Sequence, residues 1–553
     1  MSGSGAPGAR LRLVARGVVQ GVGARPALRR LAQRLGLRGR LCNQAGELEA
    51  DLCGARPQLE AFLAALPEAL PAGARLEELS HQWLPSPRPV WPAWVRIAAA
   101  PAVPLGRALV APGLAADRAP CGHCLAELDT PGDRRHRYPF ISCCDCGPRF
   151  SLATALPFCR AHTTLAAFQP CPACAREFSD PADRRCHSET ISCPACGPRL
   201  RLLNGAGEPL AEGEAALAGA LDRLRAGDVL ALQGVGGFQL LVAADQERAV
   251  ERLRQRKRRP AKPLALLVHD PAQLGGEVWL SASEERLLRD PAAPIVLLRR
   301  QPCAAGALSD VATAVLPGGA RGLVSGVATG LVPDVATGLV PGAVPGLASG
   351  VASGLAPGVA SSLAPGIAYG VAPGAPSLGV MLPASPLHHL LVRAVGRPLV
   401  CTSGNRSGEP LCLDRREAEE RLAGIADALL HHDRPIARRL DDSVLQLIDG
   451  RPSLLRRARG YAPHPLPLQP LPQSLGGSMA AAVQIALGSD LKSAPALAQD
   501  DTCWLAPHLG DVAEGATLQR LQSGTFHLAS ARQPALQAVQ SDLRIKEHKG
   551  AVE

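Results

Sequence analysis

Two sets of four cysteines, fifty residues apart, constrain this chain more than any other sequence feature. Each set has two Cys-x2-Cys pairs separated by eighteen residues: Cys121, Cys124, Cys143 and Cys146, then Cys171, Cys174, Cys193 and Cys196. Four thiolates in two short pairs close a tetrahedron around Zn²⁺ and leave no open coordination position. The spacing therefore predicts two structural zinc ions, with an iron–sulfur cluster or unmetallated cysteines as the alternatives.

The residues around the cysteines repeat as well. Asp133-Arg134-Arg135 recurs as Asp183-Arg184-Arg185, and both copies end in Cys-Gly-Pro-Arg. This periodicity indicates a duplicated module within residues 118–200. Three further cysteines fall outside the pattern, and we expect them to be buried thiols that bind no metal: Cys144, Cys159 and Cys186.

Length and composition narrow the class of protein. The 553 residues suggest three or four compact units. The sequence lacks a charged start followed by an apolar run, and its 17 cysteines favour metal binding or catalysis over disulfides, so we expect a cytoplasmic protein. The net charge of +10 permits anionic partners without selecting one. Residues 335–392 contain no charged side chain, but their prolines argue against a membrane-spanning helix.

Residues 10–98 have the pattern of a small α+β unit. The expected order is strand, helix, hairpin, helix, strand, as in a ferredoxin-like fold, and residues 47–52 alternate like an exposed strand. The first strand leads into Gly21-Val22-Gly23-Ala24-Arg25. Glycines there let backbone N–H groups converge on an anion, and a guanidinium grips phosphate through two bonds. The loop is a candidate phosphate site, with a simple turn as the alternative.

Residues 208–463 have an α/β pattern that a low-complexity segment interrupts. Residues 304–376 consist mainly of Gly, Pro and small apolar residues, partly as an eight-residue repeat. Such a segment buries too little surface to offset its ordering entropy. We therefore expect a flexible insertion over residues 304–376.

Two polar segments of this α/β region are candidate binding sites. Residues 254–262 hold six cations, which suits a solvated basic face, a nucleic-acid contact or nucleotide phosphates. The aromatic content of 3% favours phosphates over single-stranded nucleic acid. Thr402-Ser403-Gly404-Asn405 follow a short apolar strand. Their hydroxyls and amide suit phosphate or a carbonyl, with a capping turn as the alternative.

Taken in order, these motifs resemble the HypF family of carbamoyltransferases, maturation factors of nickel–iron hydrogenases. The resemblance rests on the loop ending in Arg25, the paired cysteine modules, R-x-R-K-x-R-P-x-K-P at 254–263, T-S-G-N-x-S-x-E-P at 402–410, Asp441-Asp442-Ser443-Val444 and residues 456–463. It implies a multi-domain α+β and α/β protein. The implied domains are a ferredoxin-like acylphosphatase domain (10–98), tandem zinc fingers (118–200), a YrdC-like nucleotide-binding domain (208–463) and an incomplete, actin-like ATPase type of transferase domain (464–553).

The same resemblance implies a relay that starts from carbamoyl phosphate. Arg25 matches the family's phosphate-binding arginine and Asn43 its water-positioning asparagine. In the YrdC-like domain, ATP with Mg²⁺ would convert carbamate to carbamoyl adenylate. The residues that match its nucleotide- and carbamoyl-binding motifs are Lys257, Arg259, Lys262, Thr402, Ser403 and Asn405. The last domain would pass the carbamoyl group to the C-terminal cysteine of HypE, on the way to the cyanide ligand of the hydrogenase iron.

Three features depart from the family pattern. Ala24 replaces the usual aromatic residue before Arg25, and Gln239 replaces a histidine. Residues 532–553 fit poorly and hold two of the five lysines, Lys546 and Lys549. We therefore expect a truncation or frame change that puts the transfer step in doubt.

Two other interpretations stay open at this point. One is a related O-carbamoyl- or threonylcarbamoyl-forming enzyme with a different acceptor. The other is a zinc-ribbon protein that binds nucleic acid, which would rest on the positive charge and the cysteine modules. We favour the carbamoyltransferase with HypE, carbamoyl phosphate and ATP as partners, and we expect neither a membrane nor a nucleic-acid partner.

Overall fold

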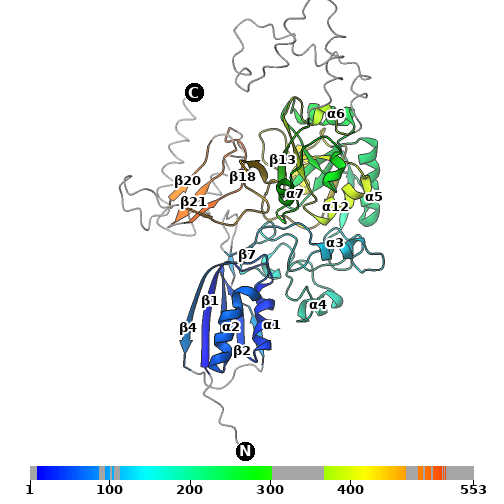
Figure 1. The fold of residues 1–553 in the computed structure, drawn as a ribbon. Helices are drawn as coiled ribbons and strands as arrows, with labels where there is room; N and C mark the ends of the chain where they lie inside the picture. Colours follow the sequence, from blue (N-terminus) through cyan, green and yellow to red (C-terminus); the bar gives the residue numbers. More distant parts are fainter. Residues whose placement is uncertain are drawn as a thin grey trace, which may run out of the picture.

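The computed structural model describes residues 9–85, 94–99, 102–104, 113–301, 366–468, 484–489, 492–499, 502–513, 515 and 517. These residues form an α+β lobe, a pair of cysteine modules and a larger α/β domain, drawn from bottom to top in Figure 1. A small β-sheet flanks the α/β domain on the side away from α5 (Figure 1). The modules therefore lie between the two larger parts.

The amino-terminal lobe is a five-stranded sheet of order β4-β1-β3-β2-β5, with α1 and α2 packed on it (Figure 1). Its elements are β1 (Ala9–Val18), α1 (Ala24–Arg34), β2 (Arg38–Gln44), β3 (Glu47–Gly54), α2 (Arg56–Ala69), β4 (Arg75–Leu84) and β5 (Val95–Ala98). This order confirms the ferredoxin-like fold. The expectation that residues 47–52 form an exposed strand is wrong, because β3 pairs with a strand on each side and Leu48 and Leu52 are fully buried.

The cysteine modules and the segments beside them contain only short elements among the described residues. They are β6 (Val103–Pro104), α3 (Gly122–Asp129), β7 (Ala155–Leu156), the 3-10 helix η1 (Arg160–His162) and α4 (Pro172–Ser179). Each module's α-helix begins directly after the first cysteine of its copy. In Figure 1, α3 lies nearer the α/β domain and α4 nearer the amino-terminal lobe.

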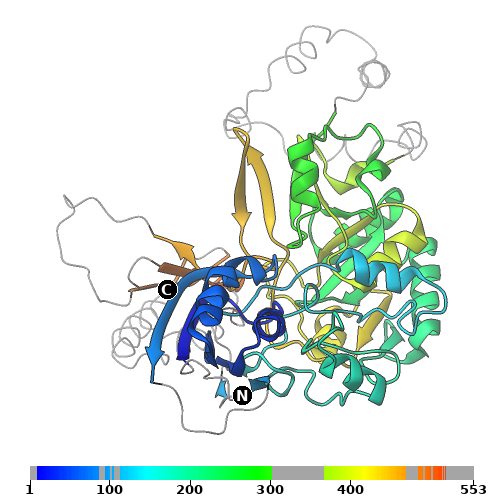
Figure 2. The ribbon, with the colours of Figure 1, turned by 60° about the horizontal axis from the view of Figure 1, so that its bottom comes forward.

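The α/β domain is built on an eleven-stranded sheet of order β18-β17-β13-β14-β12-β15-β11-β10-β16-β8-β9. Its central strands are mainly apolar and wholly buried, as expected for a sheet covered on both faces. Strands β17 and β18 also form a hairpin that projects from the domain (Figure 2). The strands are β8 (Leu200–Asn204), β9 (Pro209–Glu212), β10 (Leu230–Gln233), β11 (Phe238–Ala243), β12 (Ala265–Leu267), β13 (Ile295–Arg299), β14 (Ser377–Met381), β15 (Leu399–Ser403), β16 (Ala428–His432), β17 (Val444–Ile448) and β18 (Arg451–Arg456).

Helices pack against this sheet and follow its strands. They are α5 (Gly213–Ala226), α6 (Glu247–Lys257), η2 (Pro271–Leu274), α7 (Ala282–Leu288), η4 (Tyr369–Val371), α12 (Pro386–Val395) and α13 (Arg415–Arg421). Most of the expected insertion lies outside the described residues. Its expected end at 376 is wrong, because Val371 and Ala372 are buried and the Leu264 N–H donates to the Val371 carbonyl at 2.9 Å.

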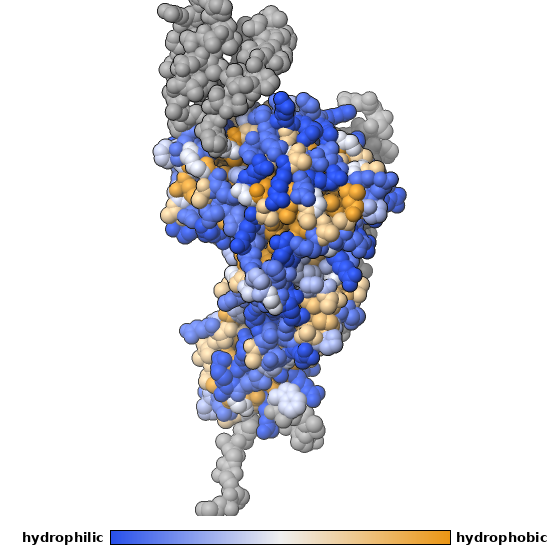
Figure 3. Space-filling model, turned by 90° about the vertical axis from the view of Figure 1, so that its right-hand side faces the viewer, coloured by the Kyte–Doolittle hydropathy of each residue, from blue (hydrophilic) through white to orange (hydrophobic). Residues whose placement is uncertain are grey.

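The small sheet has the order β19-β22-β21-β20. Its strands are β19 (Leu466–Pro467), β20 (Gln484–Ala486), β21 (Ala496–Gln499) and β22 (Thr502–Leu505). Among the residues described, no helix is both long and apolar enough to cross a membrane. The face seen in Figure 3 is mainly hydrophilic, with hydrophobic side chains gathered in separate patches.

Candidate active sites and metal centres

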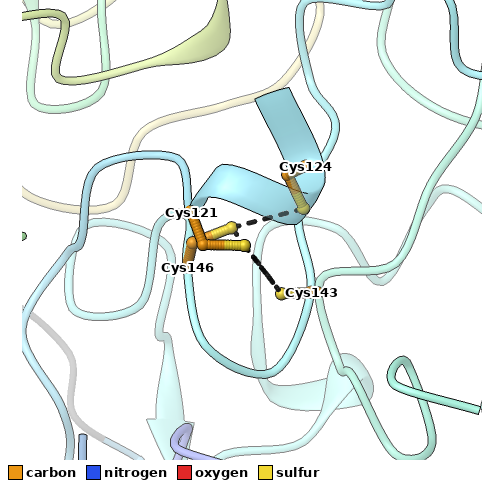
Figure 4. A group of neighbouring side chains, drawn as sticks. All are labelled: Cys121, Cys124, Cys143 and Cys146. Carbon is orange, nitrogen blue, oxygen red and sulfur yellow. Dashed lines mark hydrogen bonds between the residues drawn. The ribbon is translucent and has the colours of Figure 1, made fainter. Parts of the chain in front are cut away.

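The eight cysteines of the two quartets form two clusters. Linked Sγ atoms lie 3.5–3.8 Å apart in the first cluster and 3.7 Å apart in the second. The sulfurs of Cys121, Cys124, Cys143 and Cys146 point toward one another (Figure 4), and the ligand atoms of each cluster lie within 4.8 Å of one another. Zn–S bonds of about 2.3 Å in a tetrahedron place sulfurs about 3.8 Å apart. Both clusters therefore fit a zinc ion.

Arginines of each module contact the cysteines of the other module. Arg184 donates to the Cys124 Sγ at 3.4 Å, and Arg134 donates to the Cys174 Sγ at 3.2 Å. Glu127 of α3 pairs with Arg184, and Glu177 of α4 pairs with Arg134. These cations compensate the negative charge of thiolate ligands, and the carboxylates hold them in place. The two sites are thus linked through the residues around them.

The first candidate active site lies where β1 ends and α1 begins. Gly21 and Gly23 both have φ near +76°, which lets the chain turn sharply into the helix. Helix α1 starts at Ala24, so its unpaired N–H groups and the Arg25 guanidinium face the same region. The region is a recess with about 320 Å³ of empty volume. It has the backbone geometry that an anion requires.

Arg25 and Asn43, the two residues predicted to act in this lobe, both line this recess. Asn43 is 2% exposed, and its Oδ1 has no hydrogen-bond partner. A buried amide oxygen without a donor is costly, so such an atom commonly marks the place of a bound water or ligand. A water molecule donating to Oδ1 would be held beside Arg25.

The second cysteine module closes the recess with residues that no sequence motif predicted. His187, Ser188 and Glu189 line it together with Arg25, although they are more than 160 positions later in the chain. Arg25 Nη2 donates to Glu189 Oε1 at 2.8 Å. Burial, and next the charges of Arg25 and Arg29, lower the pKa of His187 to about 4. The site therefore combines residues of two domains.

The second candidate site is formed by α6 and the turn after β15. Lys257 is 2% exposed and donates from Nζ to the Asn405 carbonyl at 2.6 Å and to Asn405 Oδ1 at 2.9 Å. It also donates to the Ser403 carbonyl. Burial, followed by the charge of Arg259, lowers the pKa of Lys257 to about 7. Lys257 therefore holds the turn at residues 403–405 in place.

The other predicted residues of this site are spread around the turn. Arg259 Nη1 donates to Thr402 Oγ1 at 3.3 Å, and Ser403 Oγ donates to Asn405 Oδ1 at 2.7 Å. Lys262 is exposed. The basic run is not a solvated face, because Arg254 is buried and donates to the Arg259 carbonyl at 2.8 Å and to the Val371 carbonyl at 3.1 Å.

A second recess of about 320 Å³ adjoins this turn and includes Ser403. Gln239, which stands where the resemblance predicts histidine, donates to Asp442 Oδ2 at 2.8 Å. Its Oε1 accepts from His388 Nε2 at 2.8 Å, and burial lowers the pKa of His388 to about 4. Because the proton of neutral His388 is on Nε2, its Nδ1 is an acceptor, and this buried atom has no hydrogen-bond partner. In the sequence, Ser403, Gln239 and the motif Asp441-Asp442 pointed to this recess, but nothing there marked His388 as the partner of Gln239.

Known family models match the amino-terminal lobe, the two cysteine modules and the α/β domain. The HypF finger model matches residues 121–153 and 171–203, which contain the two cysteine quartets. The acylphosphatase model matches residues 11–90, and the Sua5/YciO/YrdC model, described as telomere recombination, matches 222–318 and 336–458. A carbamoyltransferase HypF of Rhodobacter capsulatus is 39% identical over 539 residues, 96% of this chain. Over nearly its whole length, the chain is therefore similar to HypF carbamoyltransferases.

A second HypF protein shows the same similarity. The carbamoyltransferase HypF of Synechocystis sp. is 36% identical over 528 residues, which are 95% of this chain. The chain spans 59% of the length of that relative and 60% of the Rhodobacter capsulatus protein. The HypF Kae1-like domain model matches residues 480–549. We expected residues 532–553 to depart from the family pattern. This expectation is wrong for residues 532–549, which the model matches.

Solved HypF structures share the fold. A crystal structure of full-length HypF in a phosphate- and nucleotide-bound form has a TM-score of 0.76 and 30% identity, and covers 95% of this chain and 59% of that one. HypF from T. kodakarensis has a TM-score of 0.74 and 27% identity, and covers 94% of this chain and 57% of that chain. The arrangement of lobe, modules and α/β domain is thus that of the HypF fold.

Proposed function

We propose that this chain carries out the carbamoyl phosphate chemistry of a carbamoyltransferase. It hydrolyses carbamoyl phosphate at Arg25 and Asn43, and it activates the resulting carbamate with ATP in the α/β domain. The observation that carries the proposal is the first recess, where a buried Asn43 Oδ1 without a partner lies beside Arg25 at the start of α1. A phosphate- and nucleotide-bound HypF supports ligands of both kinds in the fold.

In the first step, water attacks the phosphoryl group and the bond to the carbamoyl oxygen breaks. The N–H groups at the start of α1 and the Arg25 guanidinium hold the phosphoryl oxygens, where negative charge develops. Asn43 accepts from the attacking water and fixes its direction. The products are phosphate and carbamate.

In the second step, a carbamate oxygen attacks the α-phosphorus of ATP, and pyrophosphate leaves. Arg259 supplies positive charge for the phosphates, while the Ser403 hydroxyl and the Asn405 amide suit the planar carbamoyl group. Asp441 lines the adjoining recess. Burial would raise the pKa of this carboxyl, but His508 and Arg456 outweigh burial and lower it, so Asp441 stays ionised and suits Mg²⁺ with ATP.

A route between the two sites that excludes water would protect carbamate, which decomposes in water. The second recess shares Val235 and Ala384 with a third of about 440 Å³, which Phe140 and Pro148 of the first cysteine module also line. Arg149, the next residue along the chain, lines the first recess. In this proposal the zinc ions have a structural role, and the carbamoyl group finally passes to a cysteine of HypE.

Pyrophosphate release from ATP in the presence of carbamoyl phosphate tests the proposal. Arg25→Ala should lower both phosphate and pyrophosphate release by about a hundredfold or more, because it removes a charged contact to the transition state. Arg12→Ala, an arginine of β1 with a side chain 52% exposed, is the matched control and should change neither rate.

Adding ammonium carbamate separates the two sites. It should restore pyrophosphate release to Arg25→Ala, since that variant keeps the second site, but not to Asn405→Ala. Full activity of Arg25→Ala on carbamoyl phosphate would contradict the proposed first step. Pyrophosphate release that is independent of both carbamoyl phosphate and carbamate would contradict the second.

A further inference from the structure

We propose that Ser188 and Glu189 of the second cysteine module recognise the amide end of the acyl phosphate at the Arg25 site. They thereby select carbamoyl phosphate over acyl phosphates whose acyl group has no N–H. This inference rests on the hydrolysis proposed above. It assigns substrate selection to a module outside the acylphosphatase-like lobe, 164 positions after Arg25.

Glu189 is fixed at the edge of the recess by contacts on both carboxylate oxygens. Oε1 accepts from Arg25 Nη2 at 2.8 Å, and Oε2 accepts from the backbone N–H of Arg160 at 3.0 Å. The Glu189 side chain is 7% exposed, and its backbone carbonyl accepts from Arg160 Nη1 at 3.1 Å. Each carboxylate oxygen has a second lone pair. The carboxylate is thus both rigid and able to accept further hydrogen bonds.

Ser188 supplies an independent sign of a ligand. It lines the same recess, is 2% exposed, and its Oγ has no hydrogen-bond partner. With Asn43 Oδ1, it is the second buried polar atom of the recess that lacks a partner. Buried hydroxyls are almost always hydrogen-bonded, so these two atoms point to a polar molecule between them.

The chemistry of the recess matches a carbamoyl group at this end. Among the described residues that line it, Glu189 is the one acidic side chain. The phosphoryl group belongs at the start of α1 and at Arg25, which leaves the acyl group toward Ser188 and Glu189. A carboxylate accepts but does not donate, so it pairs with an N–H of a carbamoyl –NH₂ and gains nothing from an acetyl methyl group. The Ser188 hydroxyl donates to the carbamoyl oxygen.

The test is the ratio of kcat/KM for carbamoyl phosphate to that for acetyl phosphate, measured by phosphate release from the whole chain. A site built to bond an N–H loses discrimination when its acceptor is removed. Glu189→Ala should lower the ratio by about tenfold or more, and Ser188→Ala should lower it by a smaller factor. Glu189→Gln keeps an acceptor oxygen and should retain part of the preference. Glu60→Ala, on the exposed face of α2, is the control and should leave the ratio unchanged.

The ratio distinguishes recognition from a merely structural role. If Glu189 served to orient Arg25 alone, both rates would fall together and the ratio would stay within twofold, which would overturn the inference. Zinc content and inhibition by inorganic phosphate check the fold of each variant. If Glu189→Ala loses zinc, the ratio measured for Ser188→Ala decides the test. A wild-type chain with no preference between the two substrates overturns this inference alone. A wild-type chain that hydrolyses neither overturns the proposed function.

Discussion

The two cysteine modules have the same ligand spacing, yet their equivalent loops serve different parts of the molecule. In the first module, Tyr138 and Phe140 pack against the α/β domain, and the Phe140 ring lies 5.0 Å from that of His432. Fifty residues later, Ser188 and Thr190 take the corresponding positions, and the loop closes the Arg25 recess. The cysteines therefore fix the backbone, and the intervening residues decide which neighbour the loop meets.

Backbone geometry supports the equivalence of the loops. Arg137 and His187 occupy the same position in the two copies, with φ of +55° and +53°. Few side chains adopt this left-handed conformation, so the repeat preserves an unfavourable local geometry in both modules. The difference between the loops lies in their side chains.

Removing one zinc ligand from each module should show the largest difference. Cys121→Ala and Cys171→Ala should each reduce bound zinc from two ions to one, since apparent binding free energies of roughly 10–16 kcal/mol depend on complete ligand sets. Cys124 and Cys143 belong to the same buried cluster as Leu217 and Leu430, whereas the second quartet packs with Ile191 and Phe178. Cys121→Ala should therefore lower the melting temperature of the α/β domain more.

Metal analysis, thermal unfolding and carbamoyl phosphate hydrolysis together check this prediction. Cys171→Ala should lower the rate of hydrolysis more than Cys121→Ala does, because Glu189 belongs to the module that contains Cys171. Cys53→Ala, a partly buried cysteine of β3, should keep two zinc ions. Equal losses of stability and hydrolysis in the two ligand variants would break the comparison.

Substitutions at equivalent loop positions should come next in size. Phe140→Ala removes a side chain that is 6% exposed and stacks edge-on against Tyr138 and His432, and should lower the free energy of unfolding by about 3–5 kcal/mol. Thr190→Val removes a hydroxyl that accepts from Ser142 at 3.0 Å, and should cost about 1 kcal/mol. Chemical denaturation measures both. A larger loss of stability from Thr190→Val than from Phe140→Ala would contradict the view that the first loop, and not the second, packs into the α/β domain.

The contacts between modules sharpen the comparison at the level of metal affinity. Glu127→Gln should release Arg184 from the Cys124 thiolate, and Glu177→Gln should release Arg134 from Cys174. Residues around metal ligands typically change affinity by about 10–100-fold. Competition with a chelator should show one weakened site in each variant. The exposed Glu212→Gln should weaken neither.

The smallest effect should come from pH, because the equivalent positions 137 and 187 differ in titration. The pKa of His187 is lowered to about 4 in the folded state from 6.5, so the unfolded state binds the proton first as pH falls. The stability from neutral His187 is thus complete above pH 6.5 and is lost progressively between pH 6.5 and 4. His187→Asn suits the left-handed backbone and should lose less melting temperature between pH 7 and pH 5 than the wild type. An identical loss would show that other groups control this range.

Local patterns were enough to predict much of the molecule. The quartets, the loop ending in Arg25 and the strand that begins at Leu399 each depend on residues close together in sequence. The structure forms all three, although this strand also includes Thr402 and Ser403, which were expected to follow it. Burial could not be predicted in the same way. Arg254 and Lys257 have the composition of a charged surface, but backbone carbonyls that are distant in sequence make them interior residues. The sequence contains one sign that Glu189 is special. The equivalent position of the first module holds Pro139, so the two copies differ there.

The pairing of Arg25 with Glu189 also ties the first active site to the order in which the chain is made. The two residues are 164 positions apart, and ribosomes add about 5–20 residues per second. Roughly ten to thirty seconds therefore separate synthesis of the arginine from synthesis of its carboxylate partner. Throughout that interval the emerging lobe has its glycine loop and its guanidinium but no second module over them. A nascent chain that stalls between these positions would expose an anion site that lacks the residues proposed to choose its substrate.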